Sequence, residues 1–67
     1  MTAPRWNAYR FPPALAFLRP LVRSKAIEIA NALVREGRED DEALHLAIER
    51  AKLWDKRRRR GLGEEFL

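Results

Sequence analysis

The chain has 67 residues, a net charge of +4 at neutral pH and no cysteine. Its length allows one small domain, and the lack of cysteine excludes disulfide bonds and thiolate metal sites. The longest stretch without a charge is interrupted by proline and is far too short to cross a bilayer, and the first residues hold no apolar signal core. We therefore expect a cytoplasmic protein without membrane contact.

The charges are segregated along the chain. Residues 1–27 carry five bases and no acid, residues 28–49 carry seven acids against two bases, and residues 50–60 carry seven bases against Asp55. Such blocks bear on solubility and partners rather than on fold. The two basic blocks are therefore the first candidates for contact with a negatively charged partner.

The first nineteen residues are predicted to form an arm rich in aromatic residues and proline. Pro12 and Pro13 favour a short helical turn over residues 14–18, because proline is tolerated at the first helical positions. Pro20 then disfavours a helical conformation at the residue before it. We expect the arm to pack its aromatic side chains on the second helix. The expected contacts are those of Trp6, Tyr9 and Phe17 with Leu46, Leu53 or Trp54.

The first helix is predicted over residues 20–36. Pro20 suits a first turn, and Gly37 can adopt the left-handed conformation that ends many helices. Apolar residues recur at the spacing of one buried helix face, namely Val22, Ala26, Ile29, Ala30 and Leu33. On the opposite face, Asn31 is expected to bind the arm or the next turn through hydrogen bonds. The alternative is a partner surface that it shares with Glu28.

The second helix is predicted over residues 41–60, after the acidic turn "GREDDE" and before Gly61. Its alanines at 43, 47 and 51 form a stripe that lets the first helix approach closely. Leu46 and Leu53 point away from that stripe, so we expect them to meet the arm or a second subunit. Residues 61–67 lack periodicity and are predicted to be a flexible tail.

Two helices joined by a short turn pack as antiparallel neighbours. The predicted fold is therefore all-α: an antiparallel two-helix hairpin with an aromatic N-terminal arm that carries a short helical turn. Residues 1–60 are expected to form one mini-domain, in which residues 1–19 are the arm and residues 20–60 are the hairpin.

Two strings of the hairpin resemble a known family. "PLVRSKAIEIANALVREG" (residues 20–37) and "ALHLAIERAKLW" (residues 43–54) are similar to the small bacterial YdaT-type proteins, which are related more loosely to ChaB-type proteins. The resemblance covers roughly residues 6–54, whereas the turn "GREDDE" and the run over residues 57–60 depart from the family pattern. It implies the helical fold and leaves the function open. The ChaB-type description, a cation transport regulator, implies an ion-linked regulator as one alternative.

The sequence offers little material for catalysis. One histidine, one serine, one threonine and no cysteine provide no nucleophile–base pair, so we expect neither an enzyme nor a cofactor. Asp41, His45 and Glu49 share a helix face but span about 12 Å, which is too long for one metal ion. We therefore expect no metal site, and an ion pair between His45 and Glu49.

Five consecutive bases close the second helix. Bases in a last turn favour the negative end of the helix dipole, and Asp55 can pair with Arg58 or Arg59, but one or two bases would suffice for that role. In an antiparallel hairpin the run lies beside the start of the first helix. We call this combined set the basic pole; it consists of Arg19, Arg23, Lys25, Lys56, Arg57, Arg58, Arg59 and Arg60.

A basic pole of this kind is typical of proteins that contact the nucleic-acid backbone. The sequence has no base-reading motif, so we expect contact with DNA or RNA that is non-specific and strongly dependent on salt. The alternatives are an acidic protein partner, or a pole that only maintains solubility. A different class of function is a regulatory or protein-interaction module, either monomeric or joined into a homodimer through Leu46 and Leu53.

Overall fold

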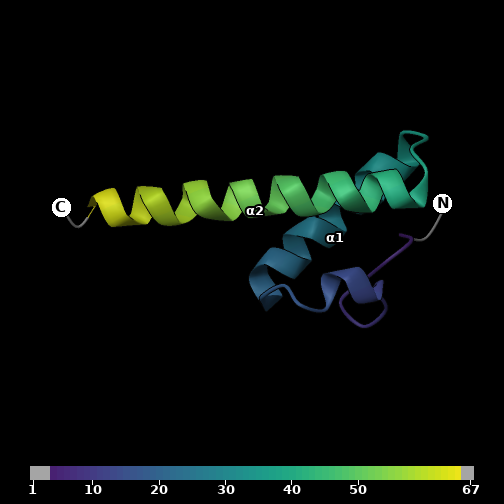
Figure 1. The fold of residues 1–67 in the computed structure, drawn as a ribbon, viewed down its shortest axis with the longest axis horizontal. Helices are drawn as coiled ribbons and strands as arrows, with labels where there is room; N and C mark the ends of the chain where they lie inside the picture. Colours follow the sequence, from purple (N-terminus) through teal and green to yellow (C-terminus); the bar gives the residue numbers. More distant parts are fainter. Residues whose placement is uncertain (1–3, 66–67) are drawn as a thin grey trace.

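The computed structural model describes residues 4–65, with side chains up to residue 60. It contains a 3-10 turn, η1 (Pro13–Leu15), and two α-helices, α1 (Pro20–Arg35) and α2 (Asp40–Glu65). The two helices pack against each other and cross obliquely (Figure 1). No β-strand occurs within residues 4–65. The predicted all-α hairpin is confirmed.

The ends of α1 follow from the residues that flank it. Arg19 is extended, with φ −61° and ψ 151°, as expected before a proline, and Pro20 begins the helix. At the other end Gly37 has φ 102°. The amide of Gly37 donates to the carbonyl of Val34 at 3.0 Å, and the amide of Arg38 donates to that of Leu33 at 3.1 Å. Gly37 therefore ends the helix in the predicted left-handed conformation.

The helix α2 is longer than predicted. It begins with three acids in its first turn, which suits the positive end of its dipole, but it continues through Gly61 to Glu65. The predicted stop at Gly61 and the predicted unstructured tail are wrong for residues 61–65; residues 66–67 lie outside the described residues. Gly61 and Gly63 each cost only about 1 kcal/mol relative to alanine inside a helix, and the arginine, leucine and glutamate residues around them are good helix formers.

Small residues form the contact between the helices. The alanines of α1 at 26 and 30 and those of α2 at 43, 47 and 51 are fully buried. Because alanine has only one side-chain carbon, the two backbones approach closely, as predicted. The arm adds Leu15 and Leu18, which pack on this alanine layer, and Leu15 is the largest fully buried side chain. The core is therefore an alanine seam between the helices, with Val22 and Ile27 of α1 buried beside it and two leucines of the arm covering it.

The start of the arm is attached to α1 by a side-chain amide. Asn31 accepts a hydrogen bond from the backbone amide of Trp6 at 3.0 Å, and its own amide group donates to the carbonyl of Trp6 at 2.9 Å. The Asn31 side chain thus pairs with both backbone groups of Trp6, as a residue of a neighbouring β-strand would. The predicted bond between Asn31 and the arm is confirmed. Glu28, its neighbour on that face, is exposed and lies 3.7 Å from Lys25.

The aromatic side chains of the arm are placed differently from the prediction. Trp6 is half-buried and packs on the core, but Tyr9 is 98% exposed and Phe17 is 66% exposed. Tyr9 lies in the tight turn between Asn7 and Arg10, in which the Asn7 side chain accepts the amides of Tyr9 and Arg10. The expected cover of α2 by Tyr9 and Phe17 is therefore wrong.

The position of Phe17 follows from the turn that precedes it. η1 and the residues after it place Leu15 and Leu18, three positions apart, on the side that faces the core. Phe17 lies between them in sequence and consequently points away. The arm therefore covers the core with leucine and presents an aromatic ring to solvent.

The molecule is elongated because α2 is longer than the rest of the fold. Its principal extents are 45 × 22 × 22 Å. Figure 1 shows the arm and α1 gathered against the first part of α2, while the C-terminal part of α2 projects beyond them. The last bases of the chain therefore lie on a projecting helix.

Candidate nucleic-acid interface

The two basic blocks meet at Asp55, a carboxylate of α2 with only 3% of its surface exposed. From the residue before α1, the guanidinium of Arg19 donates a hydrogen bond to Asp55 Oδ2. From the next turn of α2, Arg58 lies 3.1 Å from Oδ1 and Arg59 lies 3.2 Å from Oδ2. The predicted pairing of Asp55 within its helix is confirmed, and Arg19 extends it to the start of α1.

The surroundings of Asp55 keep it charged. Burial by itself would raise the pKa of its carboxyl group, because the charged form loses solvation. The hydrogen bond from Arg58 and the positive charges of Arg19 and Arg59 act in the opposite direction and outweigh burial, so the pKa lies below the ordinary value of 3.8. One negative charge therefore faces three guanidinium groups, and the cluster keeps a net positive charge.

Arg23 has a role in the fold. Its guanidinium group donates to the carbonyl oxygens of Leu18 at 2.9 Å, Leu15 at 3.2 Å and Ala16 at 3.3 Å. It also lies over the ring of Phe11, 4.9 Å from the centroid. Arg23 therefore joins the end of the arm to α1. Its donors are directed at the protein rather than at a partner.

Lys25 and Arg58 share the indole ring of Trp54. The Lys25 ammonium lies 5.3 Å from the ring centroid and the Arg58 guanidinium lies 5.4 Å from it. These contacts are within the range of cation–π attraction. Lys25 comes from α1, whereas Arg58 and Trp54 come from α2. The three residues therefore form a second link between the helices beside Asp55.

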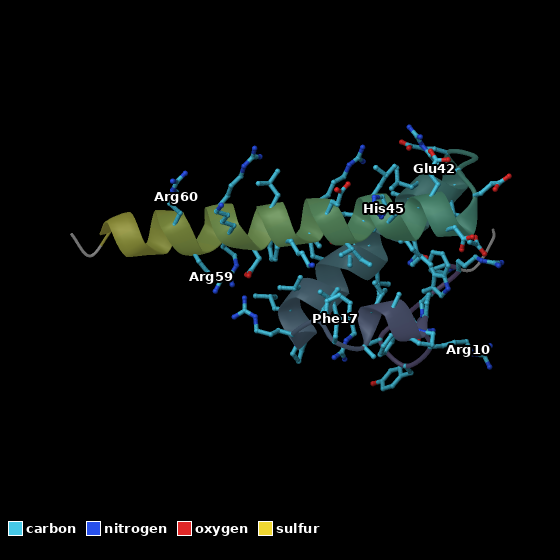
Figure 2. The ribbon with its side chains drawn as sticks, in the orientation of Figure 1. Arg10, Phe17, Glu42, His45, Arg59 and Arg60 are labelled. Carbon is cyan, nitrogen blue, oxygen red and sulfur yellow. The ribbon has the colours of Figure 1, made fainter. Side chains whose placement is uncertain are left out.

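The remaining bases of the pole are exposed: Lys56, Arg57 and Arg60. Lys56 and Arg57 form no ion pair with any side chain that the structure describes. Figure 2 shows Arg59 on the side of α2 that faces α1, and Arg60 on the opposite side. The bases therefore surround the projecting part of α2 instead of lining one face of it.

A groove of about 480 Å³ lies where the arm, the start of α1 and α2 meet. We call it the basic groove; it is lined by Phe17, Leu18, Arg19, Val22, Lys52, Asp55, Lys56 and Arg59. Four of these residues are bases and one is an acid. The ammonium of Lys52 lies 5.3 Å from the centroid of the Phe17 ring. The groove thus combines an exposed aromatic ring with positive charge.

A second groove, of about 470 Å³, lies on α2 itself. It is lined by Arg50, Leu53, Trp54, Arg57 and Arg58. Leu53, one of the two predicted interface residues, is 46% exposed, whereas Leu46 is half-buried. Tyr9 and Phe17 do not cover this surface, so Leu53 remains available to a second subunit.

Two further expectations concern metals and membranes. His45 Nε2 lies 3.9 Å from Glu49 Oε2, which confirms the expected pair; it is an ion pair only when the histidine is protonated. Among the side chains described, no group of three or more potential ligands could hold a metal ion. Over residues 4–65, neither helix combines the length and apolar character needed to cross a bilayer.

Among the exposed residues of the basic groove, Phe17 and Lys52 were not predicted to belong to a binding site. Lys52 could have been found, because it lies four positions before Lys56 and seven before Arg59 and so shares their helix face. Phe17 could not, because its exposure depends on how the turn at Pro13 orients Leu15 and Leu18. The burial of Asp55 could also have been predicted, because Asp55 continues the four-residue spacing of the alanine stripe.

The fold and the site together define a small helical hairpin protein with a strongly basic end. Over 49 residues the chain is 43% identical to YdaT of Bacillus subtilis (strain 168), a protein described as uncharacterised. The match takes in 73% of this chain and 33% of that relative, so the chain spans a third of the relative's length. It supports the YdaT-type resemblance seen in the sequence. No family model and no solved structure matches the chain.

Proposed function

We propose that this chain is a small non-catalytic binding protein that contacts the nucleic-acid backbone through the basic pole, without sequence preference. The observation that carries the proposal is the meeting of two basic blocks at Asp55, to which Arg19 binds from one side and Arg58 and Arg59 from the other. A single buried carboxylate holds like charges together and neutralises only one of them. The surplus charge at this end is available for phosphates.

The distribution of charge over the whole molecule favours an oriented encounter. The first turn of α2 holds Asp40, Asp41 and Glu42. Figure 2 shows Glu42 at one end of the helix and Arg59 and Arg60 toward the other. A polyanion is repelled by the first end and attracted by the second, so it should approach the projecting part of α2. Electrostatic steering of this kind raises association rates and weakens as salt is added.

Affinity measurements with charge-matched variants test the proposal. Fluorescence anisotropy of a labelled oligonucleotide is recorded for the wild type, for Lys56→Gln with Arg57→Gln, and for Arg10→Gln with Arg35→Gln. Both double variants lose two positive charges, but the second pair lies outside the pole and is exposed. We expect the first variant to bind several-fold more weakly and the second to bind nearly as the wild type does. Equal losses in both would mean that net charge alone acts, and the proposal would fail.

A homodimer joined through the second groove is the other candidate. It is favoured by Leu53, which is 46% exposed beside Trp54. Leu53 and Trp54 give the groove an apolar centre with three arginines around it, and apolar patches with a polar rim mark interfaces. Sedimentation equilibrium at high micromolar concentration should then give a dimer mass that Leu53→Gln reduces to that of a monomer. A monomer mass for the wild type would exclude this candidate.

A further inference from the structure

The basic groove combines features that point to one kind of polyanion. Phe17 is 66% exposed, although the core lies directly beside it and Leu18, the next residue, is buried. Its ring is therefore presented to solvent directly beside a buried residue of the core. Lys52 lies over that ring at 5.3 Å from the centroid. An aromatic ring beside a cation is the arrangement on which unpaired nucleobases stack.

The basic side chains of the groove fall into two groups. Arg19 and Arg59 bind Asp55 and hold the wall of the groove together. Lys52 and Lys56 form no ion pair with any described side chain and are exposed. They are one helical turn apart, about 6 Å along the axis, which matches the spacing of neighbouring phosphates on an extended strand. Two neighbouring phosphates can therefore contact the two lysines while the nucleobase between them contacts Phe17.

We infer that the basic groove binds single-stranded nucleic acid, with one base stacked on Phe17 and the adjoining phosphates on Lys52 and Lys56. The inference rests on the proposed function and specifies its ligand. In a duplex the bases are paired and stacked on one another, so their faces cannot reach Phe17. A duplex can then use only the phosphate contacts. The groove volume of about 480 Å³ is within the range of pockets that hold small ligands.

The test separates stacking from charge. The wild type is titrated by fluorescence anisotropy with an oligothymidine of about 12 nucleotides and with an abasic strand that carries the same number of phosphates. We expect the base-bearing strand to bind roughly 5- to 150-fold more tightly, which is the effect of one stacked base. Phe17→Leu should abolish that preference, and Phe17→Trp should retain it. Tyr9→Leu, which removes an even more exposed aromatic ring outside the groove, should leave it unchanged.

The outcomes distinguish the inference from the proposed function. Equal binding of the two strands by the wild type would overturn the inference and leave backbone contact intact, and so would an unchanged preference in Phe17→Leu. Binding to neither strand would overturn both. Lys52→Gln should weaken binding of both strands, whereas Arg50→Gln, on the same helix outside the basic groove, should affect both less. Should Phe17→Leu unfold, the comparison of the two strands on the wild type and on Phe17→Trp still tests the inference.

Discussion

Replacement of Asn31 by alanine tests how the arm is held. The side chain makes two hydrogen bonds with the backbone of Trp6, at 3.0 and 2.9 Å. Each such bond contributes about 0.5–1.5 kcal/mol net, so their loss costs about 1–3 kcal/mol. Alanine regains about 0.6 kcal/mol because it favours the helix more than asparagine does. We therefore expect Asn31→Ala to lower the free energy of unfolding by about 1.5 kcal/mol, with a range of roughly 0.5–2.5.

Thermal unfolding followed by far-ultraviolet circular dichroism measures this loss. For a domain of this size, about 1.5 kcal/mol corresponds to a decrease in Tm of roughly 6–12 °C. Glu28→Ala is the matched control, because Glu28 is exposed, lies one turn earlier on the same face and makes only a 3.7 Å ion pair with Lys25. Its Tm should change by a few degrees at most. A Tm for Asn31→Ala at or above that of the wild type would refute the role given to Asn31.

Three further predictions concern the core, the charge cluster and the arm. Leu15→Ala should cost about 2–5 kcal/mol in chemical unfolding because Leu15 is fully buried, whereas Tyr9→Ala should cost under about 0.5 kcal/mol. Asp55 has a lowered pKa, so its contribution to stability is present above the ordinary carboxyl range and is lost as pH falls through the lowered value. Asp55→Asn should therefore be less stable than the wild type at neutral pH, and urea unfolding at decreasing pH should show that difference shrinking below about pH 4. Arg23→Gln should lower Tm through loss of its three carbonyl contacts, and an unchanged Tm would contradict its placement.

The hairpin could be predicted because its signals are local. Pro20 and Gly37 mark the ends of α1 through their own backbone preferences, and the alanine spacing marks the buried face of each helix. The end of α2 could not be predicted in the same way. Gly61 is compatible with a helix interior at a modest cost, so a glycine alone does not decide between a stop and a continuation. Whether the helix stops or continues at Gly61 depends on the residues on both sides of it.

The basic pole was predictable in outline and not in detail. The start of α1 and the C-terminal part of α2, which are distant in sequence, meet there because the helices run in opposite directions, which follows from the short turn between them. The sequence predicted the pairing of Asp55 with Arg58 or Arg59, but it could not show which groups most of the other basic residues contact. Arg23 binds carbonyls of the arm, and Arg58 divides its contacts between Asp55 and Trp54. The contacts of Arg23 depend on the arm's path, which is set by the contacts of Leu15 and Leu18 with the core, whereas those of Arg58 lie within α2.

The salt dependence of binding tests the central claim most directly. Each phosphate contact on a single strand contributes about 0.7 to the slope of log affinity against log salt concentration. The variant with Lys56→Gln and Arg57→Gln should therefore have a slope about 1.4 smaller in magnitude than that of the wild type. Its Tm should stay near that of the wild type, because both side chains are exposed and glutamine retains helix propensity. An unchanged slope would contradict the claim that the basic pole binds the nucleic-acid backbone.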